Sequence, residues 1–194
     1  DDSEFPIRIT AEGVVVDGFV VRDGYKGLVA TTGDVGNPLT GIEFRNIEAH
    51  SNANDGVTFW RVEGGTMENI SAHHNGDNGI YANGPNNTVM GSEAWANGDQ
   101  GIDISNDYDE GDSGDLHWGG ATVKHCEAYG NENGGIELDD DEGKAHVEDC
   151  ETWENDIRSD NDASGLVLNN TSSVEYVDGK FKDGIAVGGL DTDP

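Results

Sequence analysis

The sequence is poor in positive charge, and it has few prolines, few cysteines and no long apolar segment. Its 194 residues contain 10 Lys and Arg against 40 Asp and Glu, which gives a formal net charge of −30. Such a surface repels the phosphates of nucleic acid, which excludes nucleic acid as a partner. Because no apolar run approaches the ~18 residues that span a bilayer, membrane insertion is excluded as well. The two cysteines have no CxxC or Cys/His spacing, which excludes a zinc site of that type.

What the sequence has instead is a repeated unit of twenty-odd residues, rich in Gly and Asn. Four copies read IEAHSNANDGVTF (47–59), ISAHHNGDNGIYA (70–82), SEAWANGDQGIDI (92–104) and CEAYGNENGGIEL (126–138). The repeat glycines Gly56, Gly79 and Gly101 are 23 and 22 residues apart. Helical repeats would show 3.6-residue periodicity and few glycines, whereas this chain has 29 glycines and short alternating apolar runs. The repeat therefore predicts an all-β, single-stranded parallel β-helix of about seven to eight coils.

Alternation within each unit assigns its side chains to the inside or the outside of the coil. The apolar residues one and three positions after the repeat Gly are expected to point inward. So are two residues at alternate positions of the strand that precedes the Asn. One Asn of each unit is expected to join a ladder of stacked, hydrogen-bonded amides: Asn52, Asn75, Asn97, Asn131 and Asn155. Cys126 and Cys150 fall in one inward column, where the spacing permits either a disulfide or two buried thiols.

We expect a single domain over residues 1–190, with acidic insertions at 105–120 and 156–164 and a linker or tail at 191–194. The first residues and the last segment, GGLDTDP, favour a processed piece of a longer secreted or cell-surface protein. Two origins explain the acidic composition: a halophilic source, in which salt screens the self-repulsion, or an extracellular protein loaded with calcium.

The outward positions after each repeat Gly are the first candidate site. Asp103 and Glu137 are predicted vertical neighbours, with Asp139 beside them and Trp60 and Tyr81 two coils below. Adjacent carboxylates bind a hard cation or share a proton. Exposed aromatic rings on a flat sheet suit sugars, so the substrate-binding candidates are Trp60, Tyr81 and Asn83. The simpler interpretation is a solvated face of a very acidic protein.

The insertion SNDYDEGDSGDLHWGG (105–120) is the second candidate site. It contains Asp107, Asp109, Asp112 and Asp115 with glycines at 111 and 114, a spacing similar to that of calcium loops, although the terminal Glu of an EF-hand is missing. An acidic surface turn is the alternative.

A second outward column precedes the Asn ladder and consists of planar side chains: His50, His73, Trp95, Tyr129 and Trp153. These rings either stack on one another and cover the sheet edge, or they form a platform for polysaccharide or for another domain. Other domains or protomers of a longer surface protein are further candidate partners of the chain as a whole.

The Asn-containing coils and Gly-apolar steps, over about residues 14–187, resemble right-handed parallel β-helix repeats of the pectate lyase superfamily. DQGIDI (99–104) and GGIELDDDEG (134–143) are similar to calcium-binding coils of some pectate lyases, and this resemblance implies Asp103, Glu137 and Asp139 as Ca²⁺ ligands. Lyase chemistry of this kind needs a base for the C5 proton of a uronate. The Gly-rich Lys motif, the Asp-Pro-His motif of epimerases and the hydrolase motifs are absent, which leaves Lys144 and His117 as the catalytic candidates.

Two functions follow from these patterns. The first is a secreted, calcium-dependent, lyase-like module that acts on or binds acidic polysaccharide. The second is a non-catalytic surface, adhesin, spike or filament module that binds glycans or spaces other domains.

Overall fold

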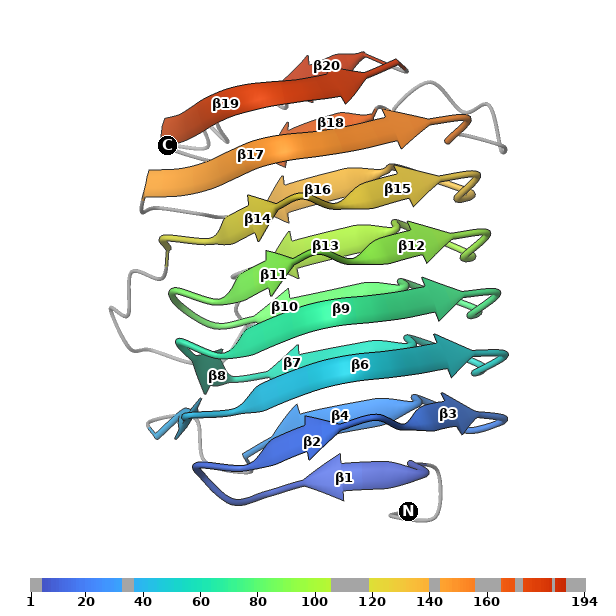
Figure 1. The fold of residues 1–194 in the computed structure, drawn as a ribbon, viewed down its shortest axis with the longest axis vertical. Coiled ribbons are helices and arrows are strands. Elements are labelled where there is room, and N and C mark those ends of the chain that lie inside the picture. Colours follow the sequence, from blue (N-terminus) through green and yellow to red (C-terminus); the bar gives the residue numbers. More distant parts are fainter. Residues whose placement is uncertain are drawn as a thin grey trace, which may run out of the picture.

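The computed structural model describes residues 5–32, 37–105, 119–139, 144–155, 165–169, 173–182 and 184–187. Its strands wind as a stacked spiral, with β1 at one end and β20 at the other (Figure 1). Every strand pair is parallel, and each strand pairs with its equivalent in the next coil, as in Ile80 with Ile102. The predicted parallel β-helix is therefore confirmed.

One sheet has eight strands, one from each coil, which agrees with the predicted seven to eight coils. In spatial order they are β1 (Ile7–Ile9), β4 (Leu28–Thr31), β7 (Val57–Trp60), β10 (Ile80–Asn83), β13 (Ile102–Ser105), β16 (Ile136–Asp139), β18 (Leu166–Asn169) and β20 (Ile185–Val187). From β4 onward, each begins directly after a Gly, where the chain returns from the turn that follows the ten-stranded sheet.

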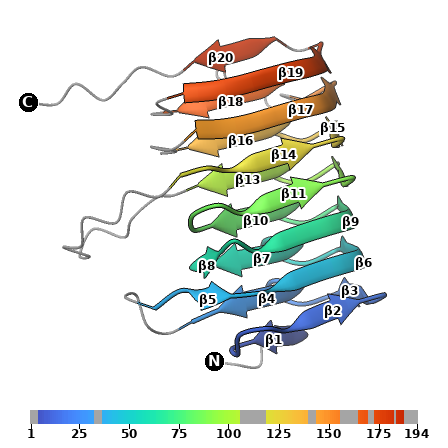
Figure 2. The ribbon, with the colours of Figure 1, turned by 60° about the vertical axis from the view of Figure 1, so that its left-hand side comes forward.

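The second sheet has ten strands and faces the first across the core (Figure 2). They are β2 (Val15–Asp17), β3 (Val20–Arg22), β6 (Glu43–His50), β9 (Thr66–His73), β11 (Thr88–Met90), β12 (Glu93–Trp95), β14 (Thr122–Lys124), β15 (Glu127–Tyr129), β17 (Lys144–Trp153) and β19 (Ser173–Phe181). A two-stranded sheet, β5 (Leu39–Thr40) with β8 (Val62–Glu63), lies at the turn between the two large sheets.

The predicted inward columns form the core. Ile80 and Ile102 from the eight-stranded sheet and Ile47 and Ile70 from the ten-stranded sheet are almost completely buried. The second column of the ten-stranded sheet is also buried and consists of small side chains: Ala49, Ala72, Ala94, Ala128 and Thr152. Period-two alternation alone therefore located the interior, because each strand presents one face to it.

The Asn ladder runs through the turn that leads from the ten-stranded to the eight-stranded sheet. The Asn75 backbone N–H and Nδ2 both donate to Asn97 Oδ1, at 3.2 and 3.0 Å, and Asn75 Nδ2 also donates to the Ala49 carbonyl at 3.1 Å. The same pattern links Asn52 to Asn75 and Asn131 to Asn155. The amides thus hydrogen-bond from coil to coil, as the sequence predicted, and they also satisfy backbone groups of a buried turn.

The repeat Gly is required by this ladder. A Cβ on Gly79 would lie 2.7 Å from Asn97 Nδ2 and 2.7 Å from the Gly101 carbonyl oxygen, closer than van der Waals contact permits. The Gly of one coil therefore makes room for the Asn and the Gly of the next, which explains why the two residue types recur together.

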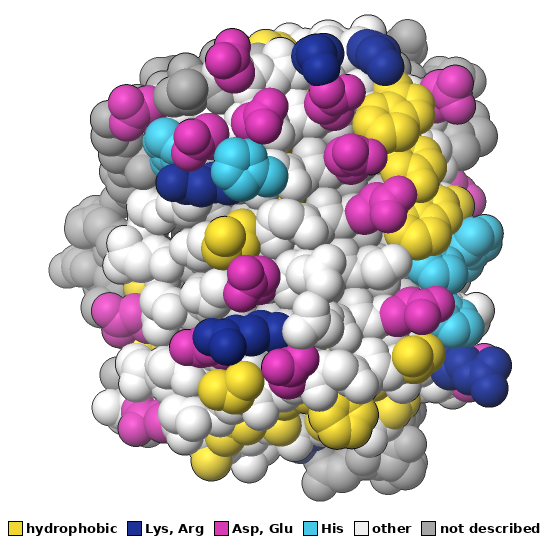
Figure 3. All heavy atoms as spheres, viewed as in Figure 1, with side chains coloured by type: hydrophobic (Ala, Val, Ile, Leu, Met, Phe, Trp, Pro, Cys, Tyr) yellow, Lys and Arg dark blue, Asp and Glu magenta, His cyan; other side chains and the backbone are white. Residues whose placement is uncertain are grey.

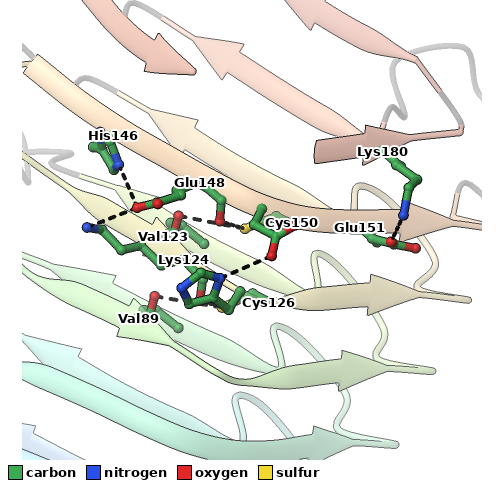
Figure 4. A network of polar contacts seen from close by, with 11 residues as sticks. Val89, Val123, Lys124, Cys126, His146, Glu148, Cys150, Glu151 and Lys180 are labelled. Carbon is green, nitrogen blue, oxygen red and sulfur yellow. Dashed lines mark hydrogen bonds and ion pairs between the residues drawn. The ribbon is translucent and has the colours of Figure 1, made fainter. Parts of the chain in front are cut away.

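Cys126 and Cys150 are buried free thiols (Figure 4). Each Sγ donates to the carbonyl oxygen two residues before it, Cys126 to that of Lys124 at 3.1 Å and Cys150 to that of Glu148 at 3.3 Å. Of the two alternatives that the sequence left open, the structure has the thiols and not the disulfide.

Candidate functional site

The first candidate site is the outer face of the eight-stranded sheet. We use "outer face" for the outward side chains of β7, β10, β13 and β16, together with the residue that precedes the repeat Gly in each turn. The strand members are Thr58, Trp60, Tyr81, Asn83, Asp103, Ser105, Glu137 and Asp139. The turn members are Lys26, Asp55, Asn78 and Gln100, which were not among the predicted site residues.

Several of these residues point outward but are not exposed, which corrects the predicted exposure of the column. Thr58, Asn83 and Glu137 are only 1, 2 and 9% exposed. Turn side chains lie over them: Asp55 accepts a hydrogen bond from Thr58 Oγ1 at 3.0 Å, and Gln100 Nε2 donates to Glu137. Alternation predicts the direction of a side chain, whereas its exposure depends on neighbours from other parts of the coil.

Lys26 brings a positive charge to this face. Its Nζ forms an ion pair with Asp55, whose side chain is 2% exposed, and lies 5.8 Å from the centre of the Tyr81 ring. Burial raises the pKa of Asp55 above its ordinary value, and the adjacent Lys26 opposes this increase. The ion pair therefore sets a partly buried cation beside an aromatic ring.

Trp60 and Tyr81 stack in neighbouring coils, with ring centroids 6.0 Å apart and planes inclined by 28°. Tyr81 also pairs in register with Asp103 on its other side. The prediction placed Tyr81 two coils below the carboxylates, but it lies one coil from Asp103, because β10 and β13 are adjacent strands.

Asp103 and Glu137 are opposite one another in adjacent strands, as predicted, whereas Asp139 lies opposite Ser105. Oδ1 of Asp103 is fully covered and has no hydrogen-bond partner. Burial, together with the nearby charges of Glu137 and Asp139, raises the pKa of Asp103 well above its usual range. The face thus contains a carboxyl group that readily holds a proton or accepts a cation.

The remaining predicted site residues are placed only in part. Asp107, Asp109, Asp112 and His117 lie outside the described residues, and Lys144 begins β17 in the ten-stranded sheet, with its side chain outside the described part. Within the described ranges, no group of three or more His, Cys, Asp or Glu side chains is arranged to hold a metal ion. The Ca²⁺ ligands therefore stay a prediction.

The sequence held a signal for the missed residues. Lys26, Asp55 and Gln100 each precede the Gly of a unit, at the same point where Asn78 stands, so the repeat alignment makes them vertical neighbours. The Gln100 backbone N–H donates to Asn78 Oδ1 at 3.2 Å, which joins two members of this column directly.

The second predicted column, on the ten-stranded sheet, is a continuous stack of rings along one edge of the view in Figure 3. Successive centroids from His50 to Trp153 are 5.1, 4.2, 5.9 and 4.4 Å apart, and the planes differ by 18° or less. Because the ring faces cover one another, a sugar ring meets mainly their edges. The longer column therefore has no advantage over Trp60 and Tyr81 as a surface that binds the face of a sugar ring.

Beside this column the ten-stranded sheet carries ion pairs on its outer surface (Figure 4). Glu148 is 3.2 Å from both Lys124 Nζ and His146 Nε2, and these two partners lower its pKa. Lys180 pairs with Glu151. These partly exposed pairs offset part of the like-charge repulsion between coils.

Comparison with known proteins places this geometry in a family. The chain matches the model of the right-handed β-helix region over residues 7–184. It has no significant match among curated protein sequences. No helix in the described part is long and apolar enough to cross a membrane.

Among solved structures, pectate lyase Pel9A is similar with a TM-score of 0.57 and 19% identity, covering 91% of this chain and 56% of that one. The A-module of the Azotobacter vinelandii mannuronan C-5 epimerase AlgE4 has a TM-score of 0.59 and 14% identity, and the match covers 90% of this chain and 60% of that one. The enzymatically active domain of tailspike protein 2 from bacteriophage CBA120 has a TM-score of 0.60 and 15% identity, and the match covers 89% of this chain and 32% of that one. The chain thus spans between a third and three-fifths of these structures' lengths. It belongs to the right-handed β-helix family and has the parallel β-helix fold of pectate lyase.

Proposed function

We propose that this chain binds acidic polysaccharide along the outer face and acts on it as a calcium-dependent, lyase-like module outside the cell. The observation that carries the proposal is the succession, across adjacent coils, of the Lys26–Asp55 pair, the Trp60–Tyr81 stack and the Asp103–Glu137 carboxyls. The names of two of the similar structures support it, because pectate and mannuronan are both polyuronates.

The face is suited to an extended polymer. Its residues follow one another along the helix axis at the strand spacing of roughly 4.8 Å. Trp60 and Tyr81 offer apolar surface to the C–H groups of a sugar ring, and Lys26 beside them attracts a carboxylate.

Lys26 is also the described residue best placed to accept a proton. In β-elimination a base takes the C5 proton of the uronate, and the electrons of the C–H bond form the C4–C5 double bond. The C4–O bond breaks with its electron pair on the leaving oxygen, which takes up a proton from water. Lysine can act as a base only after it has lost its own proton. Asp55 is hydrogen-bonded to Lys26 and is therefore the described group that would receive that proton. Lys144 and His117 remain the candidates from the sequence.

Asp103 and Glu137 are the described residues that would hold calcium. The covered and unpartnered Oδ1 of Asp103 fits this role, because hard cations prefer carboxylate oxygens. Asp139 and the predicted Asp107, Asp109 and Asp112 would supply further oxygens. When bound, the cation neutralises the carboxylate next to the acidic C5 proton.

The test is to incubate the protein with pectate, polygalacturonate and alginate and to follow the absorbance of unsaturated products, with calcium or EDTA and in low and high salt. We expect product with at least one polymer when calcium is present, and its loss in Lys26→Met. Lys182→Met is the matched control, since Lys182 lies over Trp153 on the other sheet. Absence of product under every condition refutes the lyase activity.

Binding without turnover is the second candidate function. Polar groups of the outer face hydrogen-bond to one another, as in Lys26–Asp55 and Gln100–Glu137. Groups that are paired in this way are less available for catalysis, which favours binding alone. Polysaccharide binding that is lost in Trp60→Ala but kept in Trp153→Ala, with no product formed, would establish this function. Equal binding by both variants would place the glycan elsewhere.

A further inference from the structure

Two adjacent histidines on the far side of the Asn turn bring their ring nitrogens together. His73 is the last residue of β9, and His74 follows it in the left-handed region with φ +54°. This bend turns both rings to the same side, so that Nδ1 of His73 lies 2.9 Å from Nδ1 of His74, with the ring planes at 85°. Neither residue takes part in the outer face described above.

The surroundings of His73 prepare Nδ1 as a ligand atom. Its ring is held between His50, at a centroid distance of 5.1 Å, and Trp95, at 4.2 Å. Its other nitrogen, Nε2, faces Glu48 Oε1 at 3.5 Å. A carboxylate at Nε2 favours the tautomer with the proton there, which leaves the lone pair on Nδ1. In metal sites this same carboxylate–histidine arrangement fixes the tautomer and orients the ring.

We propose that His73 and His74 form a chelating site for a divalent transition metal with square-planar preference, such as Cu²⁺ or Ni²⁺. At the metal–nitrogen distance of ~2.0 Å that is usual for imidazole, nitrogens this far apart subtend about a right angle at the metal. His73 is fixed by its stack, whereas His74 is exposed, so its ring can turn and carry its proton on Nε2 instead, which leaves a lone pair on Nδ1 for the shared metal. The metal then replaces the Nδ1–H···Nδ1 hydrogen bond.

The site lies beside a groove that leaves room for additional ligands. His74 lines a groove of about 670 Å³ together with Ser51, Asn52 and Asn75, and Asp23 and Glu132 add negative charge to its walls. No third His, Cys, Asp or Glu in the described ranges completes a metal set here. The two histidines are therefore the protein ligands, and the other coordination positions face solvent and the groove.

The experiment titrates the full chain, free of any histidine tag, with Ni²⁺ by calorimetry and with Cu²⁺ by electron paramagnetic resonance. An excess of Ca²⁺ is present throughout, because carboxylates bind that hard cation while imidazole selects the transition metals. The variants are His74→Asn and His73→Phe. Asn tolerates the left-handed conformation of residue 74, and Phe preserves the ring stack while removing the nitrogen. The matched control is His125→Asn, since His125 is also left-handed, with φ +52°, and faces Asp149.

We expect one Ni²⁺ per chain, with affinity at least ~10-fold lower in both His74→Asn and His73→Phe and unchanged in the control. The Cu²⁺ spectrum should show coupling to nitrogen that both variants reduce. Circular dichroism melts identify any variant that fails to fold. Affinity within threefold of the parent in either folded variant, or an equal loss in the control, overturns the proposal. This outcome is independent of polysaccharide cleavage, because neither histidine belongs to the outer face.

Discussion

Truncating one amide of the Asn ladder tests the physical basis of the whole fold. In Asn97→Ala, Nδ2 no longer donates to the Ala72 carbonyl, at 3.1 Å, or to Asn131 Oδ1, at 3.0 Å. Oδ1 no longer accepts from the Asn75 backbone N–H, at 3.2 Å, or from Asn75 Nδ2, at 3.0 Å. Four hydrogen bonds are therefore lost from one buried side chain.

The consequences of the four losses differ. Asn131 Oδ1 keeps the backbone N–H of residue 97, and Asn75 Nδ2 keeps the Ala49 carbonyl. The Asn75 backbone N–H loses its acceptor inside a buried turn, which costs about 1–3 kcal/mol, and each remaining bond contributes about 0.5–1.5 kcal/mol. We expect the free energy of unfolding to fall by about 3–5 kcal/mol.

Urea denaturation, followed by circular dichroism and by tryptophan fluorescence, measures this loss. Asn133→Ala is the control, because Asn133 makes one partly buried bond, from Nδ2 to Asp99 Oδ1 at 2.9 Å, on the outside of the same turn. The control should lose no more than about 1 kcal/mol. Equal losses in the two variants would refute the argument that the ladder holds the coils together.

Four further predictions follow from the described contacts. Lys26→Met should lower the free energy of unfolding at pH 7 by about 1–3 kcal/mol, because buried Asp55 loses its partner, and melts at pH 4 should show a smaller loss. The raised pKa of Asp103 means that the folded state binds the extra proton, so stability present at low pH falls as pH rises above the ordinary value of 3.8, and melts of Asp103→Asn should lack this decline. Ala96→Gly should raise the free energy of unfolding by roughly 0.5–1 kcal/mol, because Ala96 has φ +54°, and chemical denaturation measures the gain. Raising NaCl to about 1 M, where the screening length is about 3 Å, should raise the melting temperature of a chain with net charge −30; a fall would contradict the electrostatic argument.

The fold could be read from the sequence because each coil repeats the same constraints. Gly79 and Asn97 are coupled by contact, so their joint recurrence marks the register between coils. Once the register is known, two-residue alternation separates Ile80 from Tyr81 as inside from outside. A solenoid therefore converts long-range contacts into a periodic pattern along the chain.

The site was less predictable, since the outer face has no repeating rule. Its key residues, Lys26 and Asp55, stand at a point of the repeat that Asn78 and Gln100 occupy in later coils, so no single residue type marks it. Burial of Thr58 and Glu137 depends on side chains that fold over them from the turns. The pairing of His73 with His74 also depends on a left-handed residue, which alternation does not reveal.

The charge of the chain determines what the outer face can bind. A polyuronate approaching a protein with net charge −30 is repelled, and Asp55, Asp103 and Glu137 lie on the very face that is proposed to receive it. Two features reduce this repulsion locally: Lys26 neutralises Asp55, and the raised pKa of Asp103 favours its neutral form. A divalent cation bridging Glu137 and a uronate would reverse the remaining interaction, and high salt would screen the rest. We therefore expect the proposed binding of an acidic polymer to require calcium and salt, because without them the acidic surface repels a polyuronate.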